Sequence, residues 1–179
     1  MKNDDLIIKY AHHFSVTTCN QLSRDSTPYP MNANVKMGVG FDYVGSSGYL
    51  QFNFRASPKS KSVQIKSHRM MFYIMNGYLP DEVDHANHDK LDNSFENLRA
   101  ATISQNRMNT SSHKGSSSKY LGVTWCKRDE KWKSQISVEG GNKYQGCFTS
   151  ETEAAKAYNT AAAKHFGEFA NLNTIPGNE

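Results

Sequence analysis

The chain has few cysteines and no long apolar segment, and each absence excludes a class of protein. The three cysteines among its 179 residues, Cys19, Cys126 and Cys147, are far apart and form no Cys-x-x-Cys pair. They indicate neither a disulfide framework nor a zinc knuckle, so we expect reduced thiols. No segment approaches the ~18–20 apolar residues that span a bilayer, and acids interrupt the opening MKNDDLIIKYAHHF where a signal peptide would be apolar. We expect a globular protein of the cytoplasm, with no membrane partner.

Acidic residues are missing from two long stretches of a chain whose formal net charge is +4. Residues 43–80 and 97–128 contain no Asp or Glu, and together they hold 11 of the 21 Lys and Arg. Between them lie two histidines and six acids, opposed by Lys90; the acids are Asp81, Glu82, Asp84, Asp89, Asp92 and Glu96. Two interpretations stay open: solvated charge runs, or an oxygen-rich cation site flanked by surfaces that bind phosphate.

The pattern of the first half predicts small strands and short helices. The runs GVGFDYV and YLQFNFR, separated by GSSG, predict a hairpin, and SVQIK predicts a third strand. HRMMFYIMNG predicts a short helix that Gly77 closes. The first forty residues suggest only scattered strands. After VDH comes a loop, then the strand-like LRAAT, then a helix that the capping box of Thr102 and Gln105 opens, so the order is strand, long loop, strand, helix.

The second half predicts three strands and one helix. Residues 109–119, NTSSHKGSSSK, lack apolar anchors and are typical of a flexible linker. Three strand-like runs follow, YLGVTW, KWKSQISV and KYQGCF. A capping box of Ser150 and Glu153 opens a helix with Gly167 as C-cap, and we expect a small-residue stripe that includes His165 to face the sheet. The predicted layout is a β-rich region over 1–47, domains over 48–110 and 119–173, and a linker over 111–118.

Two long motifs resemble known families. VDHANHDKLDNSFENLRAATISQNRMN, preceded by SHRMMFYIMNG, resembles the HNH endonucleases, in the subclass of phage and intron-encoded homing endonucleases. Residues 119–173 resemble the AP2 DNA-binding domain. The resemblance implies an α+β protein with a ββα-metal nuclease core, followed by a three-stranded antiparallel sheet packed on one helix. It also implies a monomer that acts on double-stranded DNA, in the host cytoplasm if a phage encodes it.

The HNH resemblance assigns roles to four residues. His85 can act as the general base, because an imidazole with the ordinary pKa of about 6.5 accepts protons near neutrality. Asn97, twelve residues later, would hydrogen-bond the imidazole and fix its tautomer. Asp84 and Asn106 resemble the metal ligands, and their hard oxygens suit one Mg²⁺ or Mn²⁺ ion per site. Asp84 must point to the opposite side of its strand from His85.

Other interpretations of this motif remain open. Asp84 and His85 could form a surface turn, or His85 and His88 could belong to a zinc site, although no further ligands stand at suitable spacing. His68 could pack between helix and hairpin or support the site indirectly. Ala86 and His88 replace the family's aliphatic residue and glycine. A DNA-binding protein with a decayed nuclease core is the alternative function.

Candidate DNA contacts come from both halves. In the AP2-like half, the positions of the family's DNA-facing arginines hold Leu121, Thr124, Cys126 and Ser137, so base reading does not follow. A solvated sheet face is the alternative interpretation. The candidates are Arg55, Lys59, Lys61, Lys66, Arg99 and Arg107, and then Thr124, Lys127, Arg128, Lys133, Gln135 and Tyr144.

Overall fold

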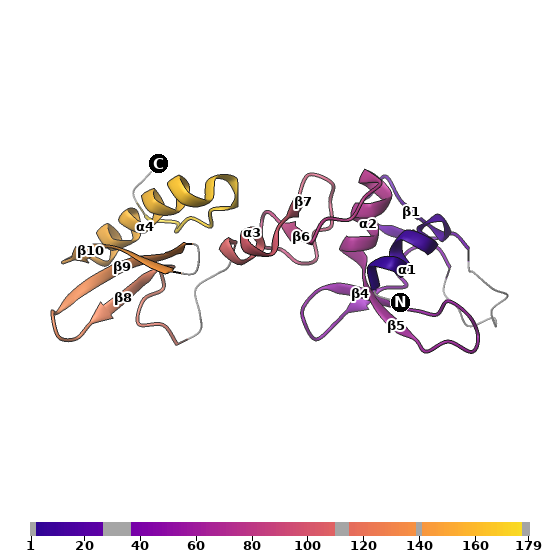
Figure 1. Ribbon diagram of the computed structural model, residues 1–179, viewed down its shortest axis with the longest axis horizontal. Coiled ribbons are helices and arrows are strands. Elements are labelled where there is room, and N and C mark those ends of the chain that lie inside the picture. Colours follow the sequence, from indigo (N-terminus) through magenta and orange to yellow (C-terminus); the bar gives the residue numbers. More distant parts are fainter. Residues whose placement is uncertain (1–2, 27–36, 110–114, 139–140, 177–179) are drawn as a thin grey trace. The chain divides into compact units, whose positions relative to one another are not determined.

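The computed structural model describes residues 3–26, 37–109, 115–138 and 141–176 (Figure 1). The chain divides into two compact units, Met1–Ile103 and Ser104–Glu179. Both combine helices with small antiparallel sheets, so the predicted mixed α+β class is confirmed. Among the described residues, no helix has the length and apolar character needed to cross a membrane.

The first unit begins with a helix that the sequence did not predict. Leu6 and Ile7 are buried on this helix, in one core with Phe14, Leu22 and Phe52. Eight residues give too little periodic signal for a confident helix assignment, and packing supplies its stability. Described residues before 47 therefore contribute to the core of the unit. The elements are α1 (Asn3–Tyr10), η1 (Ala11–His13), and the antiparallel strands β1 (Phe14–Val16) and β2 (Leu22–Arg24).

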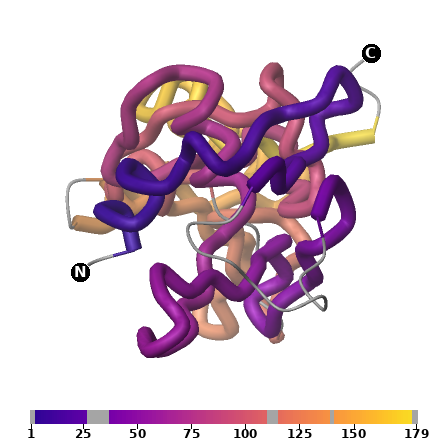
Figure 2. The backbone as a smooth tube through the Cα atoms, turned by 90° about the vertical axis from the view of Figure 1, so that its right-hand side faces the viewer, coloured from indigo at the N-terminus to yellow at the C-terminus, as the bar shows by residue number. Residues whose placement is uncertain are grey.

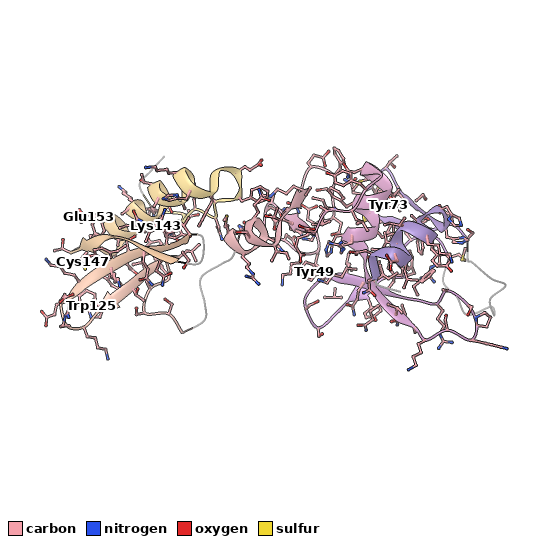
Figure 3. All side chains as sticks on the ribbon, viewed as in Figure 1. Tyr49, Tyr73, Trp125, Lys143, Cys147 and Glu153 are labelled. Carbon is pink, nitrogen blue, oxygen red and sulfur yellow. The ribbon has the colours of Figure 1, made fainter. Side chains whose placement is uncertain are left out.

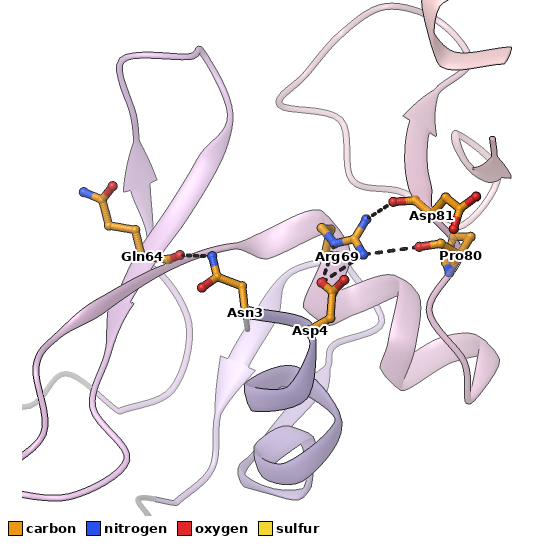
Figure 4. A network of polar contacts seen from close by, with 6 residues as sticks. All are labelled: Asn3, Asp4, Gln64, Arg69, Pro80 and Asp81. Carbon is orange, nitrogen blue, oxygen red and sulfur yellow. Dashed lines mark hydrogen bonds and ion pairs between the residues drawn. The ribbon is translucent and has the colours of Figure 1, made fainter. Parts of the chain in front are cut away.

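Arg69 ties α1 to the rest of this unit (Figure 4). Its guanidinium donates to Asp4 Oδ1 from Nε and Nη2, at 3.2 and 2.9 Å. The same group donates to the carbonyl oxygens of Pro80 and Asp81, both at 3.2 Å. A planar guanidinium suits such a junction because its donors diverge in one plane. The contacts fix the segment that leads into the next strand.

The predicted hairpin, third strand and helix are all present, and the backbone can be followed in Figure 2. Val44 pairs with Leu50 across the turn, and Phe52 pairs with Ile65. Gly77 ends the helix in the left-handed conformation, at φ 77°, which only glycine adopts without cost. The elements are β3 (Tyr43–Val44), β4 (Leu50–Phe54), β5 (Val63–Lys66) and α2 (Ser67–Asn76).

The strand, loop, strand, helix order predicted around the histidines is also confirmed. β6 (Glu82–His85) pairs antiparallel with β7 (Leu98–Ala101), and α3 (Ile103–Met108) follows directly after Thr102. The division between the two units falls at the start of α3, and Met108 packs on the core of the second unit. The sequence placed the boundary later, in a linker over 111–118, of which residues 111–114 lie outside the described residues.

The second unit is a three-stranded antiparallel sheet, in the order β10-β9-β8, with one helix packed on it. Alanines of that helix are buried, including Ala154, Ala155 and Ala162 at 0% exposure, so the predicted small-residue stripe is present. His165 is exposed, which corrects its place in the stripe. The Ser150 hydroxyl bonds the Thr152 hydroxyl, at 2.7 Å, rather than capping a backbone N–H. The elements are β8 (Val123–Cys126), β9 (Lys131–Val138), β10 (Gly141–Phe148), α4 (Glu151–Phe166) and η2 (Gly167–Phe169).

Candidate functional site

Asp84 and His85 end strand β6 and are both buried, at 5% and 4% exposure. Asp84 lies directly opposite Arg99 on β7, and His85 opposite Leu98. Arg99 donates to Asp84 Oδ2 from Nε, at 2.9 Å, and Nη2 lies 2.8 Å from the same oxygen. Opposite charges at facing positions of an antiparallel pair attract, and this explains the contact. Arg99, a predicted DNA contact, thus forms an ion pair with Asp84, a predicted metal ligand.

The His85 ring contacts an asparagine, but not the predicted one. Nε2 lies 2.9 Å from Asn93 Oδ1, and the bond is buried. An amide oxygen only accepts hydrogen bonds, so Nε2 carries the proton and Nδ1 is the basic nitrogen of the neutral ring. The sequence did not predict Asn93, because the spacing of the motif selects Asn97. Its position in the loop gave no separate signal.

Asn97 instead organises the loop between β6 and β7. Its Oδ1 accepts from the backbone N–H of Asn87 at 2.9 Å, and its Nδ2 donates to the backbone oxygen of Asp92 at 2.7 Å. Its own carbonyl accepts from Ala86 at 2.9 Å. Three bonds from one buried residue join the beginning, middle and end of the loop. The predicted Asn97–imidazole bond is thus replaced by loop contacts that hold Asn93 indirectly.

The loop acids also bond the backbone. Asp89 Oδ1 accepts from the N–H of Leu91 at 3.0 Å, and Asp92 Oδ1 accepts from Ser94 at 3.1 Å. Asp92 Oδ2 accepts from the Asn87 amide at 2.8 Å. The Ser94 bonds lower the pKa of the exposed Asp92 carboxyl. These two acids stabilise turns, in the way that Asp side chains often do.

His88 is exposed and has a positive φ of 65°. This left-handed conformation explains why the HNH family places a glycine here. Across the described residues, no three His, Cys, Asp or Glu side chains are grouped so as to hold a metal ion, and the zinc interpretation of His85 and His88 gains no support.

Three aromatic rings pack together beside the Asp84–Arg99 pair. The His85 ring centroid lies 5.0 Å from that of His68 and 5.6 Å from that of Tyr49. His68 and Tyr49 are themselves 4.9 Å apart. His68, on α2, is 3% exposed and its Nδ1 has no hydrogen-bond partner. Such a buried nitrogen resists protonation, and His85 is therefore packed against a neutral ring.

The burial of His68 predicts an acid-sensitive fold. Burial, and then the charges of His85, Lys66 and Arg69, lower its pKa to about 2; Tyr49 is the other titratable ring against it. Because the folded-state pKa lies below the unfolded value of about 6.5, the neutral His68 imidazole contributes its full stability above that pH. This contribution is lost as the pH falls. Lowering the pH from 6.5 to 5 should therefore lower the free energy of unfolding by about 2 kcal/mol.

Urea unfolding near pH 7 and near pH 5 measures this loss. His68→Phe keeps a ring of similar size and removes the titration, so its stability should depend less on pH. If both proteins lose the same stability on acidification, His68 titrates normally and this prediction is wrong.

Of the other predicted residues in the first unit, Arg55, Lys59, Lys61 and Lys66 are exposed. Asn106 and Arg107 lie on α3, beyond the start of the second unit. The structure thus gathers Asp84, His85, Asn97 and Arg99 around one loop, and Asn106 belongs to the other unit.

The sheet of the second unit carries the remaining candidates. Thr124 faces Lys133, and Tyr144 faces Gln135, across neighbouring strands. These four alternate with Ser134, Ile136 and Val138, which are buried. Because side chains alternate between faces, the four lie opposite the face that α4 covers. Lys127 and Arg128 are exposed in the β8–β9 turn, where Arg128 pairs with Asp129 at 2.9 Å.

Comparison with known proteins identifies the family to which the loop and its flanking strands are similar. Residues 66–108 match the model of the HNH endonuclease family, and this range includes Asp84, His85, Asn97 and Asn106. The chain carries an HNH endonuclease domain. The predicted enzyme class, a nuclease acting on DNA, is confirmed at this level.

Two viral relatives are similar to this chain. An uncharacterized HNH endonuclease, L560, of Acanthamoeba polyphaga mimivirus is 34% identical over 137 residues, which cover 74% of this chain and 66% of the relative. Protein 3.8 of Escherichia phage T7 is 29% identical over 77 residues, or 42% of this chain and 64% of the relative. The chain thus spans about two thirds of the length of each.

A plant relative matches a shorter stretch. The AP2-like ethylene-responsive transcription factor TOE2 of Arabidopsis thaliana is 41% identical over 61 residues, which cover 34% of this chain and 13% of that protein. No solved structure matches the chain.

Proposed function

We propose that the chain is a divalent-metal-dependent endonuclease that hydrolyses phosphodiester bonds in duplex DNA, of the homing-endonuclease kind. The observation that carries this proposal is the buried Asp84–His85 pair at the end of β6, inside the HNH domain. The pair combines a carboxylate with a histidine whose tautomer Asn93 fixes. Hydrolysis of a phosphodiester needs a nucleophilic water and compensation of the charge that develops on the phosphate.

His85 acts as the general base in this mechanism. Nε2 is occupied by Asn93, so the proton of the attacking water goes to Nδ1. His68 and Tyr49 pack against the ring and limit its rotation. Asn97 shapes the loop that presents Asn93, and is therefore a positioning residue rather than a contact of the imidazole.

The donor set fits a hard cation such as Mg²⁺ or Mn²⁺. Asp84 offers a carboxylate, which is a ligand type that such ions prefer. Arg99 contacts Oδ2 of Asp84 and holds the carboxylate in place. When bound, the ion would neutralise charge on the phosphate and on the leaving oxygen.

The second unit, in this proposal, is an AP2-like module that holds duplex DNA. Support comes from the TOE2 match and from the sheet face that carries Lys133 and Tyr144, where the lysine ammonium lies 5.6 Å from the ring centroid. Trp125 on β8 is also exposed, but it pairs with Trp132 and therefore points to the opposite face of the sheet (Figure 3). Lysines on the face that carries Lys133 suit phosphate binding, and phosphate contacts do not decide whether the module also reads bases.

Neighbouring lysines test this module. Lys133→Ala should lower the log–log salt slope of DNA binding by about 0.9, because it removes one phosphate contact. Lys143→Ala, on β10, is the matched control; Lys143 pairs with Ile136 and so alternates with Tyr144. The control should keep the wild-type slope. Equal slopes for both variants and the wild type would argue against this face as the DNA contact.

The nuclease proposal is tested by incubating the protein with supercoiled plasmid and with genomic DNA, in Mg²⁺ and in EDTA. Strand breaks in Mg²⁺ alone are expected. DNA binding without breakage in either condition would instead favour a decayed nuclease that only binds DNA.

A further inference from the structure

Tyr49 is the point where two lysines converge next to the His85 ring. The Lys66 ammonium lies 4.5 Å from the Tyr49 ring centroid, and the Lys90 ammonium lies 4.6 Å from the same centroid. Lys66 ends strand β5, and Lys90 lies in the loop between β6 and β7. Tyr49, which is labelled in Figure 3, precedes β4. Three segments far apart in sequence thus bring two positive charges to one ring, whose centroid is 5.6 Å from that of His85.

The Lys90 side chain points away from the acids that lie next to it in sequence. Asp89 and Asp92 are close along the loop, yet the Lys90 ammonium donates to the carbonyl oxygen of Ser47, at 3.0 Å. Its stem lies over Gly48, where an added Cβ would be 3.5 Å from Lys90 Cδ. The side chain therefore reaches from the nuclease loop to the β3–β4 turn.

Neither ammonium is neutralised by a carboxylate of the protein within the described residues. The ion pairs there are Arg69–Asp4, Arg99–Asp84 and Arg128–Asp129. Cation–π contacts stabilise each lysine on the ring by only about 0.5–1 kcal/mol at exposed sites. Two ammonium groups next to one ring make the local potential positive, and a positive potential attracts an anion such as a DNA phosphate.

We propose that Lys66, Lys90 and the Tyr49 ring form a clamp for the DNA backbone beside the scissile bond, where His85 activates the attacking water. The clamp deepens the proposed function and rests on it. Ammonium groups bind phosphate oxygens as point charges, and the ring sets where the two charges stand. Burial raises the Tyr49 pKa, and the charges of Asp84 and Glu82 raise it further, so the phenol stays neutral beside the phosphate. The sequence assigned Lys66 to DNA but gave no reason to select Lys90 or Tyr49.

Lysine variants of the full chain test the clamp, with Lys9→Ala as the matched control. Lys9 also lies over a tyrosine, 5.4 Å from the Tyr10 centroid, but that ring packs on Phe54. DNA binding is measured over a range of salt with Ca²⁺ in place of Mg²⁺, and single-turnover cleavage with Mg²⁺. Lys66→Ala and Lys90→Ala should each lower the salt slope by about 0.9 and slow cleavage of sub-saturating DNA roughly 10- to 100-fold. Lys9→Ala should match the wild type.

Tyr49 variants test the ring itself. Tyr49→Phe keeps the aromatic face and should retain most of the activity, whereas Tyr49→Leu should behave like the lysine variants. Thermal melting confirms that each variant folds. If Lys66→Ala and Lys90→Ala have the slope and rate of Lys9→Ala, the clamp is overturned while the nuclease proposal stands. If the wild type binds but does not cut, and the lysine variants still lose slope, the clamp stands as a DNA site and the nuclease proposal fails.

Discussion

His85→Ala is expected to slow DNA cleavage by roughly 10² to 10⁴ while DNA affinity stays nearly unchanged. The imidazole is buried against His68 and Tyr49, so its loss removes the base without removing a surface charge. Single-turnover cleavage measures the rate, and binding in Ca²⁺ measures the affinity.

His88→Asn is the control for that experiment. His88 lies three residues later in the same loop, is exposed, and has φ 65°, a conformation that Asn tolerates. It should cut at close to the wild-type rate. Cleavage by His85→Ala at the same rate as His88→Asn would remove His85 from the mechanism.

Asp84→Asn should reduce Mg²⁺-dependent cleavage by roughly 10²-fold or more, because it removes the anionic oxygen donor. Mn²⁺ binds such sites more tightly and should restore part of the activity. The substitution also leaves the Arg99 charge without its partner, so melting temperatures are needed alongside the rates.

Arg99→Gln separates the two roles of Asp84. It breaks the same ion pair but keeps the carboxylate. If Asp84 serves the cation, Arg99→Gln should retain far more activity than Asp84→Asn in Mg²⁺ and should respond little to Mn²⁺. Equal losses in both variants, with no effect of Mn²⁺, would make Asp84 a structural partner of Arg99 alone.

Local signals explain which parts of the fold were predictable. The hairpin at Val44 and Leu50, the helix closed by Gly77 and the three strands of the second unit all follow from turn residues and alternation. Helix α1 was missed because eight residues with three adjacent apolar side chains define no clear periodicity. Its burial depends on packing against residues such as Phe52, which is distant in sequence.

The sequence predicted which residues lie together at this loop, but it did not predict their contacts. Motif spacing selected Asp84, His85 and Asn97, and the structure places all three at one loop. Spacing along the chain does not reveal which side chain reaches a ring. Asn93 rather than Asn97 contacts His85, and Arg99 turns toward Asp84 because β7 lies opposite β6. Contacts of Lys90 and Tyr49 depend on the packing of distant segments, which no local pattern encodes.

The most direct test of the account is the cleavage rate of one defined DNA duplex as Mg²⁺ is titrated into metal-free protein, for the wild type and for His85→Ala side by side. The account predicts no cleavage before Mg²⁺ is added, a rate that rises and saturates for the wild type, and a curve for His85→Ala that is lower by roughly 10² or more at every concentration. Metal-free cleavage, or the same curve for both proteins, would contradict it.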